Sequence, residues 1–484
     1  MTSSAAKRAK GGGTVPARIT RAARGGTLLA VVVAAGWGPA RWAAADVALG
    51  RLFGDHMVLQ CERPFRIWGS ADPGEEVVVS IAGQRAGTKA DGFGRWIVEL
   101  PAQPPGGPHE LVATGRTTAR SADVFFGEVW LGSGQSNMVW ILTNSQDGGR
   151  ENDAADFPRI RTFTVGERPS DQPQLEPPAN AFNGPSEWRV CGPRKMGYIS
   201  AVAYFFAREL HRELDRPVGI IVSASNGTRI EPWTRSVTTP VGPELSDVPP
   251  SEYGTLYNGM IYPVMPLAKR GVIWYQGEGN VGDGMKYTSR MRALISGWRA
   301  AAADPAMPFY FVQLAPLNWG GKPIDELPKI WEAQTAALAE PGTGMIVTND
   351  IGNTGDAHPR NKRDVGIRLA RLALQHTYGR DDIAADSPLY DAMRVDGALI
   401  RVRFRHAGRG LKTRDDGPPR RFTIAGADRQ FVPAETRIEG DEVVVWSEQV
   451  PDPVAVRFAW HQTAVHNLVN DVGLPASPFR TDAW

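Results

Sequence analysis

The stretch Glu128–Met138, EVWLGSGQSNM, decides the fold of this chain. Its first four residues are a short apolar run typical of a buried strand, and a turn rich in glycine and serine follows at once. In open α/β sheets, ligands bind beyond the carboxyl ends of the strands. Ser136 on this turn is therefore a candidate nucleophile whose backbone N–H can face a developing oxyanion. The alternative is an ordinary glycine- and serine-rich loop.

Working outward from this stretch, strand-like runs alternate with amphipathic segments. Ala201–Leu214 places its apolar side chains on one face, and Ser200 is placed to cap its start. Alternation of this kind predicts a parallel sheet covered by helices on both faces, an α/β domain over residues 127–384. We expect helices over 201–214, 285–298, 329–338 and 361–379, and strands over 128–131, 217–223, 271–276, 309–314 and 345–348.

Two regions of β texture flank this core. Residues 46–126 and 385–484 contain short runs of β-branched and aromatic residues, separated by turns rich in Gly, Asp and Pro. We expect a β-sandwich-like domain in each region.

The first 45 residues carry seven basic residues and no acid. An apolar stretch over Thr27–Trp37 and a small-residue site at Ala43–Ala45 follow in order, as in a secretory signal peptide. We therefore expect cleavage near Ala45 and a secreted or periplasmic protein, with a disordered basic tail as the alternative. Cleavage would change the formal net charge from +2 to −5.

Composition excludes several classes of protein. The 54 basic and 52 acidic residues nearly balance, which gives no support to a nucleic-acid binder. No apolar run reaches the ~18 residues of a membrane-spanning helix. We expect no metal and no cofactor, because H-E-x-x-H, C-x-x-C and calcium-loop patterns are missing. Cys61 and Cys191 are either paired or, as we favour, two separate buried thiols.

The loops after the other predicted strands supply the remaining groups of an acyl-transfer site. Gly227 and Asn280 follow two of the strands and are candidate oxyanion donors. Of the eight histidines, His358 alone lies on a loop after an α/β strand with an acid, Asp356, two residues upstream. Ser225 is a rival nucleophile, since Ser223–Gly227 approaches the G-x-S-x-G pattern without its first glycine.

These segments resemble the sialate O-acetylesterase family of the SGNH hydrolase superfamily. The resemblance rests on GQSNM at 134–138, WYQGE at 274–278 and DAHP at 356–359, and extends to LYNGM at 256–260 and GLPASPFR at 473–480. It implies a flavodoxin-like core, with Ser136 as nucleophile, His358 as base and an oxyanion hole made by Ser136, Gly227 and Asn280. The substrate-binding candidates are Gln135, Gln276, Glu278 and Trp233.

The sequence departs from the family pattern at three positions. Gly355 stands where an acid often precedes the histidine by three residues, so Asp356, Asp350 or a backbone carbonyl must orient the ring. Asn226 replaces the first glycine of a Gly-Gly-Thr loop, and Gly279 stands where serine is frequent.

The expected activity is removal of O-acetyl groups from carbohydrates, sialic acid first among them, through an acetyl-enzyme on Ser136. An esterase for acetylated xylan or another plant polysaccharide is the alternative on the same fold. A non-catalytic glycan-binding protein is the alternative of another class. Trp233 and Trp274 either stack on a sugar or belong to the core.

Overall fold

The computed structural model describes residues 46–182, 184–235 and 252–484. The predicted signal peptide, 1–45, lies outside the described residues. The described residues, from 46 to 484, belong to one compact unit. Within the described ranges, no helix has both the length and the apolar character needed to cross a membrane.

The strand β8, Thr118–Gly134, is the centre of the main sheet. Its second half pairs in parallel with β13, Val218–Ala224, on one side and with β14, Gly271–Tyr275, on the other. Two further parallel strands, β15 (Phe309–Val312) and β16 (Thr343–Ile346), extend the sheet beyond β14. The order β13-β8-β14-β15-β16 is that of a flavodoxin-like doubly wound sheet, which confirms the predicted fold.

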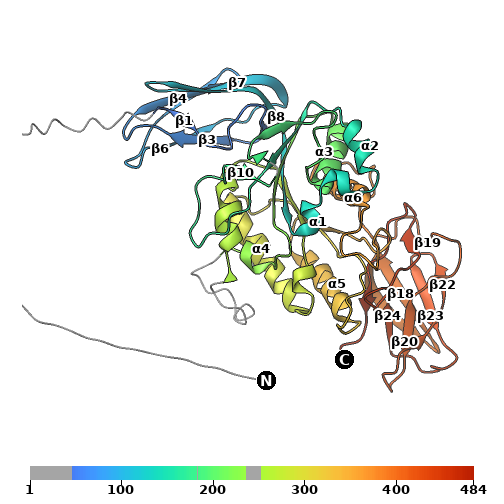
Figure 1. Ribbon diagram of the computed structural model, residues 1–484. Helices are drawn as coiled ribbons and strands as arrows, with labels where there is room; N and C mark the ends of the chain where they lie inside the picture. The colour runs from blue at the N-terminus through green and yellow to red at the C-terminus, as the bar shows by residue number, and fades with distance from the viewer. Residues whose placement is uncertain (1–45, 183, 236–251) are drawn as a thin grey trace, which may run out of the picture. The chain divides into compact units, whose positions relative to one another are not determined.

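Helices cover both faces of this sheet (Figure 1). On one face α3 (Ala201–Leu214) packs against α6 (Lys362–His376), and on the other α4 (Lys286–Ala302) packs against α5 (Glu326–Ala336). The predicted helices are therefore confirmed, with small shifts at their ends. Ser200 caps α3 as expected, since its hydroxyl accepts the Ala203 N–H at 3.2 Å.

Buried aromatic rings fill the two layers between sheet and helices. Trp130 of β8 packs on Phe206 of α3, with ring centroids 5.1 Å apart. Trp274 of β14 packs on Trp298 of α4, with centroids 5.8 Å apart. The two tryptophans thus point to opposite faces of the sheet. Because both faces are covered by helices, both need apolar side chains, which explains why these strands are apolar throughout.

Two strands beyond β13 were not expected from the sequence. β9, Ile160–Thr164, lies parallel to β13, and β12, Trp188–Val190, pairs with β9 in antiparallel orientation. Both are short and lie among loops, where apolar patterning is weak.

The N-terminal strands join the core through β8 itself. The first half of β8 pairs with β7, Gly106–Thr114, and the predicted border between residues 126 and 127 falls inside the continuous strand. The other strands of this region are β1 (Ala48–Leu49), β2 (Val58–Gln60), β3 (Phe65–Ser70), β4 (Glu76–Ile81), β5 (Gln84–Lys89) and β6 (Arg95–Leu100).

Glu128 is a buried charge at this junction. Arg270 and Arg216 donate to its carboxylate at 2.7 and 2.8 Å. Burial alone would raise the pKa of Glu128, but Arg270 holds it below its usual range. Cys61 lies 3.4 Å from the same carboxylate; both it and Cys191 are buried free thiols, as we favoured. Because two guanidinium groups donate to Glu128, we interpret Glu128 and the two arginines as an ion-pair network.

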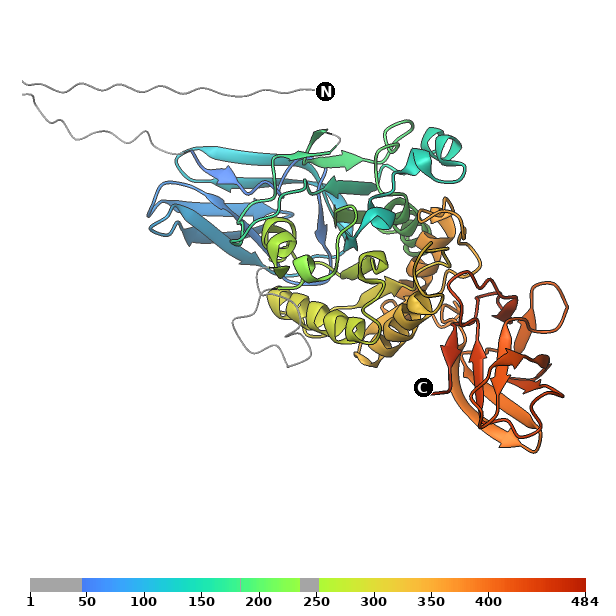
Figure 2. The same ribbon diagram turned by 60° about the horizontal axis from the view of Figure 1, so that its bottom comes forward.

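The C-terminal region has its own hydrophobic core between two four-stranded sheets (Figure 2). One sheet holds β17 (Leu389–Asp396), β18 (Leu399–Arg405), β23 (Glu442–Trp446) and β22 (Glu435–Glu439). The other holds β21 (Val432–Pro433), β20 (Phe422–Ala425), β24 (Ala455–Phe458) and β26 (Phe479–Arg480), while β19 (Leu411–Thr413) pairs with β25 (Leu468–Asn470).

Candidate active site

Ser136 begins α1, Ser136–Val139, a single turn directly after β8. The preceding turn is clamped to the end of β14, because the Gln135 N–H donates to the Tyr275 carbonyl at 3.0 Å. At Gly134, φ is 136° and a Cβ would lie 2.1 Å from that same carbonyl oxygen, so only glycine fits. Since α1 has four residues, its dipole adds little at Ser136.

His358 lies on the loop between β16 and α6, and its Nε2 is 2.8 Å from Ser136 Oγ. Its ring stacks on Trp140, with centroids 4.9 Å apart and an interplanar angle of 14°. Burial, helped by the charge of Lys362, lowers the pKa of His358, and Asp356 opposes this only in part. The imidazole is therefore neutral near pH 7, as a base for Ser136 must be.

The acidic partner of His358 differs from the expected arrangement. Asp356 accepts the backbone N–H of His358 at 2.8 Å, so its carboxylate shapes the loop. Asp350 is bound by Arg368 and by Arg414, which assigns it to a different ion-pair cluster. Among the interactions of the described residues, the contacts of the imidazole ring are Ser136 and the face of Trp140.

Asn280 does not fit the predicted oxyanion role. Its side chain is fully buried, and its Nδ2 donates to Asp283 at 2.7 Å and to Glu231 at 3.2 Å. Its Oδ1 accepts the Ile230 N–H and Gln276. Every polar atom of the amide is thus engaged inside the protein, which corrects the expectation that it faces the substrate.

Gly227, by contrast, remains a candidate donor. It lies on an exposed loop directly after β13, with φ 65°, and nothing stands within 4 Å of a Cβ built there. The loop is held beside the nucleophile turn, because the Ser225 N–H donates to the Gly134 carbonyl at 3.2 Å. Ser225 itself is buried, and the histidine ring contacts Ser136.

Three of the four predicted substrate-binding side chains, Gln135, Gln276 and Trp233, are buried in the frame of the site, and Glu278 is half-buried. Gln135 accepts the N–H groups of Gly277 and Gly279, and Gln276 bonds to Thr228 and Asn280. Trp233 has no exposed surface and meets Trp274 edge to face, so of its two alternatives the structure supports core packing over sugar stacking. The fourth, Glu278, accepts a hydrogen bond from Asn137.

Asn137 links the nucleophile turn to the histidine loop. Its Nδ2 donates to Glu278 and, at 3.0 Å, to the carbonyl of Ala357, the residue before His358. Its Oδ1 accepts Lys362, a lysine with 1% exposure whose pKa burial lowers to about 7. Lys362 and Trp140 were not among the predicted site residues, although both lie within four residues of the predicted pair.

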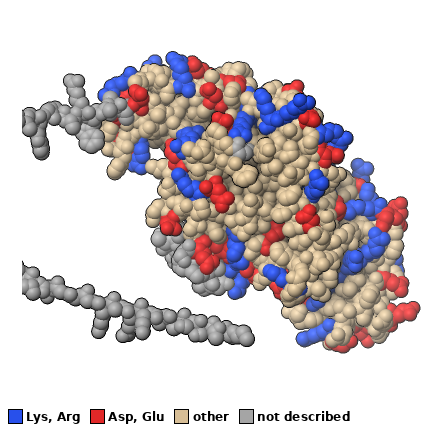
Figure 3. Space-filling view, viewed as in Figure 1, with Lys and Arg blue, Asp and Glu red and all other residues tan. Residues whose placement is uncertain are grey.

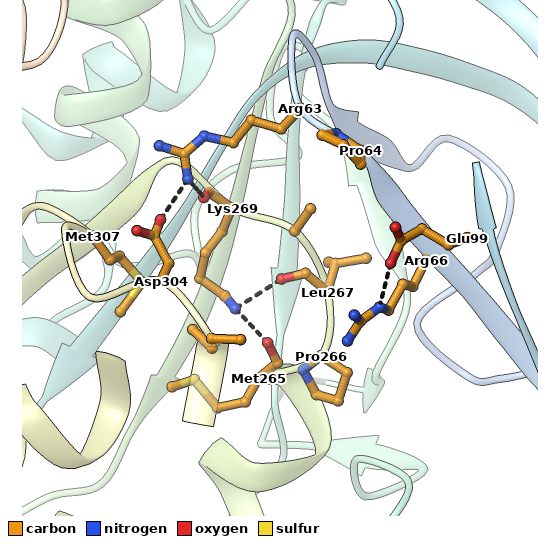
Figure 4. A pocket seen from close by; sticks show the side chains of 13 residues that line it. Arg63, Pro64, Arg66, Glu99, Met265, Pro266, Leu267, Lys269, Asp304 and Met307 are labelled. Carbon is orange, nitrogen blue, oxygen red and sulfur yellow. Dashed lines mark hydrogen bonds and ion pairs between the residues drawn. The ribbon is translucent and has the colours of Figure 1, made fainter. Parts of the chain in front are cut away.

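A pocket of about 380 Å³ lies at the opposite, amino-terminal edge of the strands (Figure 4). Its charged groups are already satisfied within the chain. Arg63 pairs with Asp304 at 2.7 Å, and Arg66 pairs with Glu99. Lys269 donates to the carbonyls of Met265 and Leu267 at 2.9 and 2.8 Å. We assign this pocket no part in the chemistry of Ser136.

Comparison with known proteins agrees with this geometry. The model of a carbohydrate esterase family, the sialic acid-specific acetylesterases, matches residues 127–375. The chain is 32% identical to the sialate O-acetylesterases of Homo sapiens and Pongo abelii over 403 residues, which cover 73% of this chain and 76% of each relative.

A solved structure is similar along almost the whole chain. The crystal structure of a carbohydrate acetylesterase from Xanthomonas citri superposes with a TM-score of 0.84 and 40% identity. The match covers 90% of this chain and 100% of that one. This chain is therefore a carboxylic ester hydrolase that belongs to the sialic acid-specific acetylesterase family of carbohydrate esterases.

Proposed function

We propose that this protein removes O-acetyl groups from carbohydrates, with Ser136 as nucleophile and His358 as base. The observation that carries the proposal is the 2.8 Å contact between Ser136 Oγ and His358 Nε2 at the carboxyl edge of the sheet, in a chain of this family. O-acetylated sialic acid is the first substrate to test, because relatives at 32% identity are sialate O-acetylesterases.

The proposed reaction has two steps. His358 accepts the hydroxyl proton while Ser136 Oγ attacks the ester carbonyl, and the Ser136 and Gly227 N–H groups stabilise the oxyanion. His358 then returns the proton to the leaving sugar oxygen. Water attacks the acetyl-enzyme with His358 again as base, which releases acetate and restores Ser136.

The decisive test is Ser136→Ala, assayed on 4-nitrophenyl acetate and on an O-acetylated sialic acid. We expect kcat to fall by at least ~10³-fold on both substrates, as for loss of a serine nucleophile. Ser225→Ala is the matched control and should keep wild-type kcat. If Ser225→Ala lost activity and Ser136→Ala kept it, Ser225 would be the nucleophile.

A second candidate substrate is an acetylated plant polysaccharide such as xylan. The solved structure at 40% identity over 90% of this chain is that of a carbohydrate acetylesterase, a class wider than sialic acid esterases. Acetate release from matched panels of acetylated xylan and sialic acid distinguishes the two candidates.

We propose that the protein is secreted and carries out this activity after export. The basic, apolar and small-residue regions of residues 1–45 support it. Expression of the full chain in a secreting host, followed by N-terminal sequencing of the exported protein, should give Asp46 as the first residue. An exported protein that keeps Met1 would contradict the proposed cleavage.

A further inference from the structure

The imidazole of His358 has no carboxylate partner among the described residues. In a Ser-His-Asp site, an acid bonded to Nδ1 holds the ring so that Nε2 faces the serine. Here Asp356 accepts the backbone N–H of His358 at 2.8 Å, and Asp350 is bound by Arg368. An imidazole on two rotatable bonds needs another contact to keep its Nε2 2.8 Å from Ser136 Oγ.

Trp140 supplies a contact of a different kind. Its ring lies nearly parallel to the imidazole of His358, with an interplanar angle of 14° and centroids 4.9 Å apart. These values are typical of an offset aromatic stack. Rotation of the imidazole about its Cβ–Cγ bond would drive one edge of the ring into the indole plane. The stack therefore restricts the torsion that sets the direction of Nε2.

The Trp140 ring is itself held from three segments of the chain. The Trp140 N–H donates to the Ser136 carbonyl at 2.9 Å, and the Trp140 carbonyl accepts the Ala201 N–H at the start of α3 at 2.8 Å. From the start of α6, Lys362 Nζ lies 5.9 Å from the centre of the ring. Because Trp140 ends the same short helix that Ser136 begins, the nucleophile and the surface under the base stay in a constant relation.

We propose that Trp140 is the positioning residue of the catalytic pair, and that its indole face holds His358 where a carboxylate does so in a triad. The inference rests on the proposed esterase function and adds the group that orients its base. In both steps His358 must move a proton between Ser136 or water and the leaving oxygen without turning away. The stack restricts this rotation without a hydrogen bond to Nδ1.

Two substitutions separate the flat face of the ring from its bulk. Trp140→Leu removes the face and keeps an apolar side chain, whereas Trp140→Phe keeps a face. On 4-nitrophenyl acetate, which needs no sugar contact, Trp140→Leu should lower kcat about 3- to 10-fold and leave KM within about twofold, as for loss of an aromatic stack. Trp140→Phe should retain most of kcat, since the indole N–H that it loses has no hydrogen-bond partner among the described residues.

The pH profile is a second readout, which a purely structural role would not change. The indole covers one face of the imidazole, and burial lowers the pKa of His358 from 6.5. Trp140→Leu should therefore move the acid limb of kcat/KM upward toward 6.5, while Trp140→Phe should leave it in place. Basic and acidic side chains are interspersed on the face shown in Figure 3, so this shift reports the surroundings of His358.

Trp319→Leu is the matched control. Trp319 is also half-buried, lies on the loop after β15, and has Lys322 Nζ 5.1 Å from its ring centre. Among the ring contacts of the described residues, none joins it to His358. The kcat of Trp319→Leu on 4-nitrophenyl acetate should therefore stay within about twofold of wild type.

A kcat for Trp140→Leu within twofold of wild type would overturn the proposal. Equal losses in Trp140→Leu and Trp140→Phe would also overturn it, and so would a change confined to KM, which would make Trp140 a substrate contact. Failure of the proposed esterase function would look different, because the wild type itself would then release no acetate from any sugar.

Discussion

Replacing Lys362 by methionine should make the protein more stable at low pH while it impairs the catalytic pair. Lys362 is 1% exposed, and burial lowers its pKa from 10.5 to about 7, with Glu278 and Asp356 offsetting only part of that cost. The folded state therefore binds this proton more weakly than the unfolded chain. The resulting destabilisation is fully present below pH 7 and disappears as the pH rises through 10.5.

The size of this effect follows from the two pKa values. The gap between 10.5 and about 7 corresponds to a cost of about 5 kcal/mol at pH 6, which falls to about 2 kcal/mol at pH 9. Lys362→Met also removes the hydrogen bond to Asn137, at a cost of about 1–3 kcal/mol that does not depend on pH. The stability of the variant relative to wild type should therefore decrease by about 3 kcal/mol between pH 6 and pH 9.

Urea denaturation followed by tryptophan fluorescence at pH 6, 7.5 and 9 measures this difference. Lys269→Met is the matched control, because burial also lowers the pKa of Lys269 to about 7, in the pocket of Figure 4. Both variants should show the same trend in stability. Only Lys362→Met should move the acid limb of kcat/KM upward toward the ordinary histidine value of 6.5, because only it removes a charge that depresses the pKa of His358. A stability difference that does not change with pH would refute the reasoning.

Three further substitutions test the frame of the site. Gly134→Ala should abolish activity and lower the yield of folded protein, since its Cβ would lie 2.1 Å from the Tyr275 carbonyl; a soluble, active variant would contradict the structure. Asp356→Asn should reduce kcat on 4-nitrophenyl acetate far less than His358→Ala, because the carboxylate contacts a backbone N–H; equal losses would restore Asp356 as the orienting acid. Asn280→Ala should lower the urea midpoint, yet reduce kcat by less than the ~10²-fold typical of a lost oxyanion donor. A loss of ~10³-fold with an unchanged midpoint would reinstate its predicted role.

The elements of the core were predictable because their burial leaves a clear apolar pattern. Helix α3 was expected over the same residues that it occupies, since its apolar spacing and its cap agree. The length of β8 was not predictable from pattern. Its first half alternates between exposed and buried residues, whereas its second half is buried throughout, so one strand has the texture of two.

The proposed catalytic pair was predictable because position after a strand carries information about the sheet edge. Ser136 and His358 are 222 residues apart in sequence, yet the parallel topology places both loops at one edge. The sequence gives no comparable indication of whether an amide group after a strand is enclosed or exposed. Asn280 and Gly227 both follow strands, but only tertiary contacts show that one is enclosed by carboxylates and the other exposed.

The polar residues of the family motifs are buried for an energetic reason. A buried amide left without a partner costs about 1–3 kcal/mol, so Gln276 and Asn137 persist inside the site only with both ends of their amides engaged. Groups engaged in this way hold the nucleophile and histidine loops in register but leave few donors for a sugar. Substrate choice must then lie with side chains outside the motifs. Chains with the same motifs can therefore share the ester chemistry and differ in the carbohydrate they bind.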